Sequence, residues 1–598
     1  MASSRSLLLD ELSSESVNVL RVRQICQNSP GIIATSGMRI RVWSLLLGLG
    51  GSSAEEVVMD PEAKCQQQQV LEADVRRTRA GVDEFRSGSY REALLHILQH
   101  FCVTHGVEYK QGMNEILAPF VFAHPPARGA SLPYRFFEAF LYRYLERYFF
   151  VDEGFYLFKA FRMFHLLLLL HEPQLALHLS SSDCPPEVYA APWFLTLFSR
   201  SLPLPHVLRL WDMLIAVDDP AFTFFVGLAL LRSKRVELLA ADSEHIPEVV
   251  CTLGFDSEEA VDRTVQEALC LRKASPRSLC RQLRLCCVST TELSPLRCVA
   301  APADMTGKEQ GLHLDMVRQS VRSCVMLPAQ ELLEGLMQNS SVAEPDRAPQ
   351  YVLLDIRSEE ECSAVGAGQL PRAVCLEPEF LSRPEALEAW LQHFDQTRGC
   401  PLCIVDLPPQ RVTGLALWKR LLLGERDGVY SQSLIYESAS EALLRCGPAP
   451  QRDLSSAYRK EEDEAAADDL VRPAVLLARR LQAAGFSNVC VLDGGYAALV
   501  TQLLRVRDSL EPLIINHEEN KWSHFISSAL SKEDAEGGRR GASRSLAANT
   551  SSKDVKNIDE ERALSPLKVL HVALKYAIRL NHGEMGGVLK AKIAALQA

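Results

Sequence analysis

Two stretches set the character of this chain: Leu71-Glu72-Ala73-Asp74-Val75-Arg76-Arg77-Thr78 and Tyr109-Lys110-Gln111-Gly112-Met113-Asn114-Glu115. They set one fixed cation, Arg77, and one amide, Gln111, into an otherwise apolar, helix-rich region. Leu71, Asp74 and Arg77 follow each other at three-residue steps, which brings all three to one side of a helix. Leu71 can then anchor the turn while Asp74 steers the arginine. The neighbouring Arg76 and Arg79 lack this offset from Asp74.

The region around the two stretches has the pattern of packed helices. From about residue 17 to 290, apolar residues recur at three- and four-residue spacing, and alternating stretches are almost absent. Proline and glycine mark the loops, as at Pro125-Pro126 and Leu202-Pro203-Leu204-Pro205. The sequence therefore predicts an all-α unit over residues 17–290, in which the large aromatics Trp43, Trp193, Phe194, Phe198 and Trp211 belong to the core. Asp212 is expected to pair with an arginine such as Arg39.

The later part of the chain has a β/α pattern. Buried strands are expected at 351–355, 402–407 and 489–492, and the helix 473–484 leads into the last strand through Gly485. Strands separated by helices predict a small parallel sheet. The expected layout is a linker at 291–329 and an α/β unit at 330–510 with a solvated acidic insertion at 440–470. A disordered linker at 511–565 and an amphipathic docking helix at 566–598 complete it.

Length and composition limit the possible functions. The 598 residues exceed what one core usually holds, so two or three units are expected. A net charge of -11 and a pI near 5.8 argue against nucleic-acid binding. The longest apolar runs fall far short of a membrane span of about 20 residues, and no secretory signal is evident. The 17 scattered cysteines indicate reduced thiols and a cytosolic protein.

One Cys-x-x-Cys spacing occurs, at Cys400-Pro401-Leu402-Cys403. Zinc would need a second ligand pair at matching spacing, which the adjacent Cys286 and Cys287 do not provide. The sequence favours two packed thiols over a metal or redox site.

Five patches in order resemble the TBC domain of GTPase-activating proteins for Rab-type GTPases, over roughly residues 17–290. The patches are Met38-Arg39-Ile40-Arg41-Val42-Trp43, then 71–78, then Tyr109-Lys110-Gln111-Gly112, then 191–198, and last Leu208-Arg209-Leu210-Trp211-Asp212. The family motif has isoleucine, aspartate and arginine at three-residue steps, and Leu71, Asp74 and Arg77 reproduce it with a leucine in place of the isoleucine.

This resemblance implies catalytic roles for Arg77 as an arginine finger and Gln111 as a glutamine finger. Asp74, Tyr109 and Gly112 would support them, with glycine allowing close approach of a partner. The arginine would supply charge and the glutamine would hold the attacking water, on GTP and magnesium that belong to a partner Rab. No cofactor of the chain's own is expected. The chain would then regulate a GTPase and would not itself be an enzyme.

Residues 330–510 resemble a rhodanese domain, through Asp355-Ile356-Arg357, Ala367 to Val374, Ala483 to Phe486 and Val491 to Tyr496. Active members carry a cysteine directly after the central strand. Here Cys403-Ile404-Val405-Asp406-Leu407 runs into Pro408-Pro409-Gln410-Arg411, and the prolines remove two of the amide donors that a persulfide cradle needs. Sulfur transfer is therefore not expected, and we expect a binding or structural module instead.

Two trafficking proteins have a similar layout, one that bridges vesicles to Golgi golgins and one that carries a kinase-like region before its TBC domain. The first would imply absent finger residues, whereas this chain keeps both. Only about 16 residues precede the helical unit here. Two hypotheses remain, a Rab GTPase activator in vesicle trafficking and a non-catalytic tether with golgins as partners. Either would be cytoplasmic, with peripheral association at Golgi, trans-Golgi or endosomal membranes.

Overall fold

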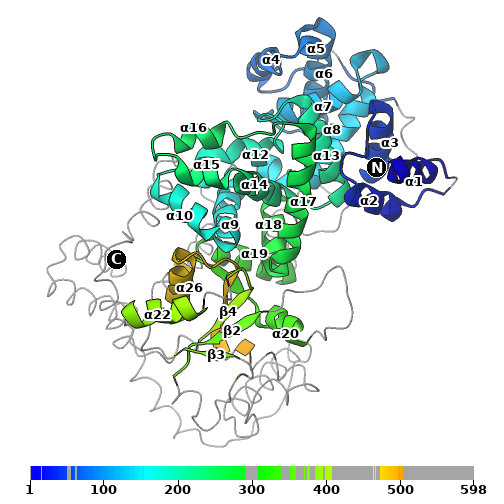
Figure 1. Ribbon diagram of the computed structural model, residues 1–598. Coiled ribbons are helices and arrows are strands. Elements are labelled where there is room, and N and C mark those ends of the chain that lie inside the picture. The colour runs from blue at the N-terminus through cyan, green and yellow to red at the C-terminus, as the bar shows by residue number, and fades with distance from the viewer. Residues whose placement is uncertain are drawn as a thin grey trace, which may run out of the picture.

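The computed structural model describes residues 2–14, 16–49, 56–60, 63–151, 154–289, 307–337, 351–358, 370, 373–376, 384–394, 398–406, 462, 465–466, 472–496, 498–499 and 502. Within these residues, a helical body is followed along the chain by a smaller unit built on a sheet (Figure 1).

The described part of residues 17–289 is helical throughout, as expected. A first helix, α1, covers Ala2–Leu12 before this region. The body then contains α2 (Val19–Asn28), α3 (Ser36–Leu46), α4 (Gln68–Arg77), α5 (Asp83–Arg86), α6 (Gly88–His105), α7 (Met113–Ala123), η1 (Pro126–Arg128), α8 (Ser131–Tyr144), the π-helical η2 (Arg147–Val151), α9 (Phe155–His171), α10 (Pro173–Ser181), α11 (Pro186–Tyr189), α12 (Ala191–Thr196), α13 (Leu204–Val217), α14 (Phe222–Ser233), α15 (Arg235–Ala240), α16 (Ile246–Cys251), α17 (Glu258–Ala274) and α18 (Arg277–Cys287).

Local sequence signals set several helix ends. The side chains of Asn18, Thr35 and Ser257 accept hydrogen bonds from backbone N–H groups in the first turns of α2, α3 and α17. Gly106 ends α6 in the left-handed conformation, with φ of 62°. At these helix ends, the local residue type thus either caps free backbone N–H groups or adopts the backbone conformation that ends the helix.

The aromatic residues expected in the core are buried. Trp43, Trp193, Phe194, Phe198 and Trp211 are each at most 1% exposed. Arg39 donates two hydrogen bonds of 2.8 Å to the carboxylate of Asp212, as expected, and the indole of Trp43 donates a third at 3.0 Å. This buried ion pair joins α3 to α13, two helices that lie far apart in the sequence.

The second unit contains a five-stranded parallel sheet in the order β1-β5-β4-β2-β3. Its strands are β1 (Val325–Leu327), β2 (Val352–Asp355), β3 (Val374–Cys375), β4 (Leu402–Val405) and β5 (Val489–Leu492). The described helices are α19 (Gly307–Ser320), α20 (Ala329–Met337), α22 (Pro384–Phe394) and α26 (Pro473–Ala483). The small parallel sheet is confirmed, with strands at the three expected places. Gly485 follows α26 with φ of 88°, as expected for a helix-ending glycine.

The two faces of the sheet belong to different cores. Leu354, Ile404 and Val491 pack with α22 and α26 on one face. Their neighbours Leu353, Cys403 and Cys490 face the opposite way and are continuous with the interior of the helical body. Helix α9 contacts both β1 and α19, and α10 contacts α26. Figure 1 shows α18 and α19 running from the body toward the sheet. The sheet therefore uses the helical body as one of its covering layers.

The described part of the expected linker at 291–329 is folded. Helix α19 buries Met316 and Val317 against the helical body, and β1 forms an edge of the sheet beside β5. The polar surroundings of these short apolar segments suggested a linker, but tertiary packing gives them partners. The α/β unit thus begins before residue 330.

Several expectations lie outside the described residues. They are the disordered linker 511–565, the docking helix 566–598, residues 408–411 and the acidic insertion 440–470 apart from Glu462, Ala465 and Ala466. Among the residues described, no helix is both long and apolar enough to cross a bilayer.

Candidate functional site

Arg77 is the last residue of α4, and its side chain is 62% exposed. Asp74, one turn earlier, is 1% exposed and pairs through its Oδ1 with the Nη2 of Arg77. Leu71, a further three residues back, is fully buried. The three-residue steps thus do what the sequence predicts, because the leucine anchors the helix and the aspartate holds the arginine at the surface.

Tyr109 connects the second stretch to the first. Its hydroxyl donates to Oδ2 of Asp74 at 2.8 Å, so the two oxygens of this carboxylate hold Tyr109 and Arg77. Burial, followed by the hydrogen bond to Asp74, raises the pKa of Tyr109, which keeps its hydroxyl protonated as a donor. The structure therefore brings Arg77, Asp74 and Tyr109 into one network.

Gly112 starts α7 in a conformation that glycine favours, with φ of 109°. A Cβ built there would lie 3.6 Å from Thr196 and 3.7 Å from Phe149, which is ordinary contact distance. The backbone angle, and not a lack of space, accounts for the glycine. Gln111, directly before it, is exposed, and its side chain has no hydrogen-bond partner within the described part of the chain. Its carboxamide is available to a partner molecule.

Two further polar residues complete this network, and the sequence reading did not identify them. Asn114, 4% exposed, donates from Nδ2 to the hydroxyl of Thr78 at 2.8 Å. Its Oδ1 accepts from the backbone N–H of Gly112 at 3.1 Å and lies 3.0 Å from the hydroxyl of Tyr109. Thr78 donates in turn to the carbonyl of Asp74 at 2.7 Å. Both residues stand within the quoted stretches, Thr78 directly after Arg77 and Asn114 two residues after Gly112, and this closeness is the signal that could have found them.

Arg79 is also near this site, but its surroundings give it a structural role. Its side chain is 11% exposed and pairs with Glu115 at 3.2 Å. It also donates to the carbonyl of Leu202 at 2.7 Å and to the hydroxyl of Ser199 at 2.9 Å. Arg79 therefore fastens the loop after α4 to the loop after α12, and its guanidinium is engaged within the protein.

The arrangement thus presents one guanidinium and one carboxamide at the surface, above a buried polar network. The guanidinium can offer paired N–H donors to phosphate oxygens. The carboxamide can both donate to and accept from a water molecule. These are groups that can stabilise phosphoryl transfer on a bound partner.

The described carboxyl ends of the strands in the second unit hold two buried ion pairs. Arg357 donates to Asp355 at 2.9 and 2.6 Å, and Arg472 donates to Asp406 at 2.8 and 2.7 Å. Cys403 is fully buried within β4, and burial raises its pKa, whereas Cys400 is exposed. Two packed thiols were expected, and only Cys403 is packed. Within the described ranges, no group of three or more potential metal ligands occurs.

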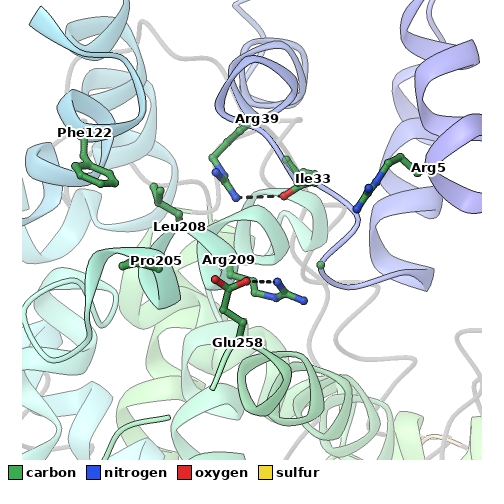
Figure 2. A pocket seen from close by; sticks show the side chains of 10 residues that line it. Arg5, Ile33, Arg39, Phe122, Pro205, Leu208, Arg209 and Glu258 are labelled. Atoms are coloured by element: carbon green, nitrogen blue, oxygen red, sulfur yellow. Dashed lines mark hydrogen bonds and ion pairs between the residues drawn. The ribbon is translucent and has the colours of Figure 1, made fainter. Parts of the chain in front are cut away.

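A hollow of about 380 Å³ lies elsewhere on the helical body, between α1, α3, α7, α13 and α17 (Figure 2). Arg5, Arg39 and Arg209 line it, together with Glu258. Arg39 is engaged by Asp212, and Arg209 by Glu258 and Asp262. Carboxylates already offset the charge of these two arginines, and neither Arg77 nor Gln111 is among the lining residues.

Comparison with known proteins places a Rab-GTPase-TBC domain over residues 36–239. Both candidate fingers lie within this range. Three curated relatives are similar to this part of the chain. The TBC domain-containing protein kinase-like proteins of Gallus gallus and Homo sapiens are 28% and 29% identical, each over 40% of this chain and 26% of their own length. TBC1 domain family member 12 of Rattus norvegicus is 30% identical over 33% of this chain and 28% of its own length.

The chain thus covers about a quarter of the length of these relatives. Two solved structures also match 45% of the chain. The Ypt/Rab-GAP domain of Gyp1p is 18% identical, covered over 97% of its length, with a TM-score of 0.38. The Chlamydomonas flagellar RabGAP TBC domain is 21% identical, covered over 94%, with a TM-score of 0.36.

Proposed function

We propose, from the TBC domain over residues 36–239, that this chain accelerates GTP hydrolysis on a Rab-family small GTPase in vesicle trafficking. Arg77 offsets the charge that develops on the phosphates, and Gln111 holds the attacking water. GTP and magnesium belong to the partner, and the chain contributes no cofactor.

The observation that carries this proposal is the exposure of both side chains above one shared network. Arg77 is held by Asp74, which is bonded to Tyr109, and Gln111 lies two residues after that tyrosine. A second nearby arginine, Arg79, is engaged by Glu115, Ser199 and Leu202. The exposure of Arg77 and its ion pair with Asp74 therefore support it over Arg79 as the proposed finger.

Single-turnover GTP hydrolysis over a panel of Rabs tests the proposal. An arginine finger contributes about 10³ to 10⁵ in rate, so Arg77→Ala is expected to remove most of the acceleration. Arg77→Lys keeps a cation beside buried Asp74 but loses the planar fork, and it should also be strongly impaired. Gln111→Ala is expected to slow hydrolysis while leaving the buried network intact.

The matched control is Arg76→Ala, because Arg76 is an exposed arginine on the same turn without an ion pair in the described structure. It should keep full acceleration. The proposal fails if the wild-type chain accelerates no Rab, or if the Arg77 and Gln111 variants match the wild type. Circular dichroism of each variant separates loss of activity from loss of folding.

For the second unit we propose a rhodanese-like module without sulfurtransferase activity. The small parallel sheet supports this assignment, and the buried position of Cys403 inside β4 argues against its use as a nucleophile. A thiosulfate sulfurtransferase assay should give no turnover above a protein-free control. Measurable turnover would overturn this part of the proposal.

The alternative function is a non-catalytic tether on Golgi or endosomal membranes, with golgins among its partners and peripheral association from the cytoplasm. The core that is continuous between the helical body and the sheet supports this alternative, because it joins the two units for binding partners. Golgin binding that survives both finger substitutions, without any GTPase acceleration, would select the tether.

A further inference from the structure

We infer that Asn114 is a positioning residue that holds the arginine-bearing helix end and the glutamine-bearing turn as one rigid unit. This inference rests on the function proposed above. Asn114 does not reach the surface where a nucleotide would lie, since its side chain is buried at 4% exposure. Its effect on the reaction is therefore indirect, through the placement of Arg77 and Gln111.

The orientation of the Asn114 amide is fixed by its neighbours. The backbone N–H of Gly112 can only donate, so the atom facing it at 3.1 Å must be the carbonyl oxygen Oδ1. Thr78 already donates its hydroxyl hydrogen to the carbonyl of Asp74, so its oxygen accepts from Nδ2 of Asn114 at 2.8 Å. The amide can thus satisfy both contacts in one orientation only.

The two contacts lie directly beside the two fingers. Thr78 is the residue after Arg77, at the position where α4 ends. Gly112 is the residue after Gln111, at the position where α7 begins. One side chain therefore connects the backbone turn of the glutamine to the helix end of the arginine, across 36 residues of sequence between Thr78 and Asn114.

Tyr109 provides a second connection, and Asn114 bears on it as well. The Tyr109 hydroxyl lies 2.8 Å from Oδ2 of Asp74 and 3.0 Å from Oδ1 of Asn114, and it has one hydrogen for both acceptors. A displaced Asn114 would change how strongly this hydrogen serves Asp74, the carboxylate that steers Arg77. Buried networks of this kind act cooperatively, so the loss of one member loosens the others.

Catalysis in trans depends on both fingers reaching one nucleotide together. A displacement of about 1 Å can cost about 100-fold in rate, even when it originates away from the reacting atoms. Removing Asn114 should therefore lower the maximal rate, whereas the concentration of this chain that gives half-maximal acceleration should change little, because the exposed contact surface is untouched.

The kinetic arm measures both quantities for a responsive Rab with the full chain. Asn114→Ala is expected to reduce the maximal rate by about 10- to 100-fold, with little change in the half-saturating concentration. Thr78→Val should reduce the rate in the same direction, and Thr78→Ser, which keeps the hydroxyl, should remain near wild type. Asn114→Ala and Thr78→Val both remove the same bond, so their effects on the rate should not multiply. The double variant should be only slightly slower than the slower of the two single variants.

The control for stability is Ser275→Ala. It removes another buried bond, the 2.6 Å contact of Ser275 with His171, which joins the C-terminal ends of α17 and α9. This variant is expected to lower the midpoint of thermal unfolding while keeping the maximal rate. If Asn114→Ala slows hydrolysis no more than Ser275→Ala does, Asn114 is merely structural and the inference is overturned.

The second arm is amide hydrogen exchange of the full chain without any Rab. Asn114→Ala should increase exchange in peptides covering residues 74–82 and also in those covering residues 107–113. An increase confined to residues 107–113 would overturn the inference, since the two segments would then not be joined. If the wild-type chain accelerates no Rab, the proposed function fails in the kinetic arm, and this exchange arm still decides whether Asn114 joins the two segments.

Discussion

The hydroxyl of Tyr109 donates to Oδ2 of Asp74 across 2.8 Å, joining the loop before α7 to the last turn of α4. The other oxygen of this carboxylate holds the guanidinium of Arg77. One buried aspartate therefore connects a surface arginine to the loop that carries a surface glutamine. The placement of the Arg77 side chain therefore depends on Asp74 and Tyr109, which are buried.

Tyr109→Phe is the first prediction. It removes one hydroxyl and leaves Oδ2 of buried Asp74 without that donor, so the free energy of unfolding should fall by about 1–3 kcal/mol. Urea unfolding followed by circular dichroism measures this change. The proposed acceleration of GTP hydrolysis should fall as well, because Asp74 would hold Arg77 less firmly.

Tyr189→Phe is the matched control for this change. The Tyr189 hydroxyl is buried and has no hydrogen-bond partner within the described structure, so its removal should leave the unfolding free energy equal or slightly higher. Equal losses of stability in the two variants would show that the bond from Tyr109 to Asp74 contributes nothing specific.

Arg79→Ala is the second prediction, and it should act through folding. The change leaves Glu115 without its buried partner and removes the donors to Leu202 and Ser199. Removal of one member of a buried pair costs about 3–5 kcal/mol, and the partly exposed Glu115 puts this case at the lower end. The urea midpoint should fall clearly, whereas Arg76→Ala, on the exposed side of the same turn, should leave it unchanged within about 0.5 kcal/mol.

The third prediction concerns pH. His171 is 8% exposed, its Nε2 lies 2.6 Å from the hydroxyl of Ser275, and burial lowers its pKa to about 3. The unfolded chain takes up this proton near pH 6.5, before the folded chain does, so stability falls as the pH drops from 6.5 toward 3. The slope for one such group is about 1.4 kcal/mol per pH unit.

Urea unfolding of wild type and His171→Gln at pH 7, 6 and 5 checks this slope. The glutamine does not titrate, so its stability should depend less steeply on pH by about the stated amount. Parallel curves for the two proteins would mean that His171 becomes protonated in the folded state.

The fourth prediction uses two glycines of the second unit. Gly485 has φ of 88°, and a Cβ there would lie 2.8 Å from Gln174 of α10 and 2.9 Å from Arg398. Gly485→Ala should destabilise the chain by more than about 1 kcal/mol. Gly311 lies within α19 with no atom within 4 Å of its Cβ position, so Gly311→Ala should stabilise by about 0.5–1 kcal/mol. Thermal unfolding of both variants tests the pair.

Much of the helical body could be predicted from its sequence. The spacing of Leu71, Asp74 and Arg77 predicts that Leu71 anchors the helix and that Asp74 holds Arg77, and the large aromatics predict the core. The strand at β5 and the helix α26 have the expected bounds to within a residue, because short apolar runs between turn residues have few alternative structures. Local patterns were sufficient wherever a segment buries one clear face.

Long-range partners were harder to predict. Asn114 and Thr78 look like ordinary polar residues in sequence, and only the fold shows that they bond across 2.8 Å. Helix α19 and strand β1 stand in a polar stretch, and their burial depends on α9 and β5, which come from distant parts of the chain. A sequence pattern contains no record of such partners.

The alternation along β4 and β5 has a consequence for any shortened form of this protein. Leu353, Cys403 and Cys490 belong to the same hydrophobic core as the helices. Residue 290 is therefore not a boundary at which two independently folding domains could be separated. A fragment ending there would lay bare the surface that α19 and the sheet now cover, and a fragment beginning there would lose one wall of its own core. Measurements on either piece would therefore describe a protein with part of its core exposed to solvent.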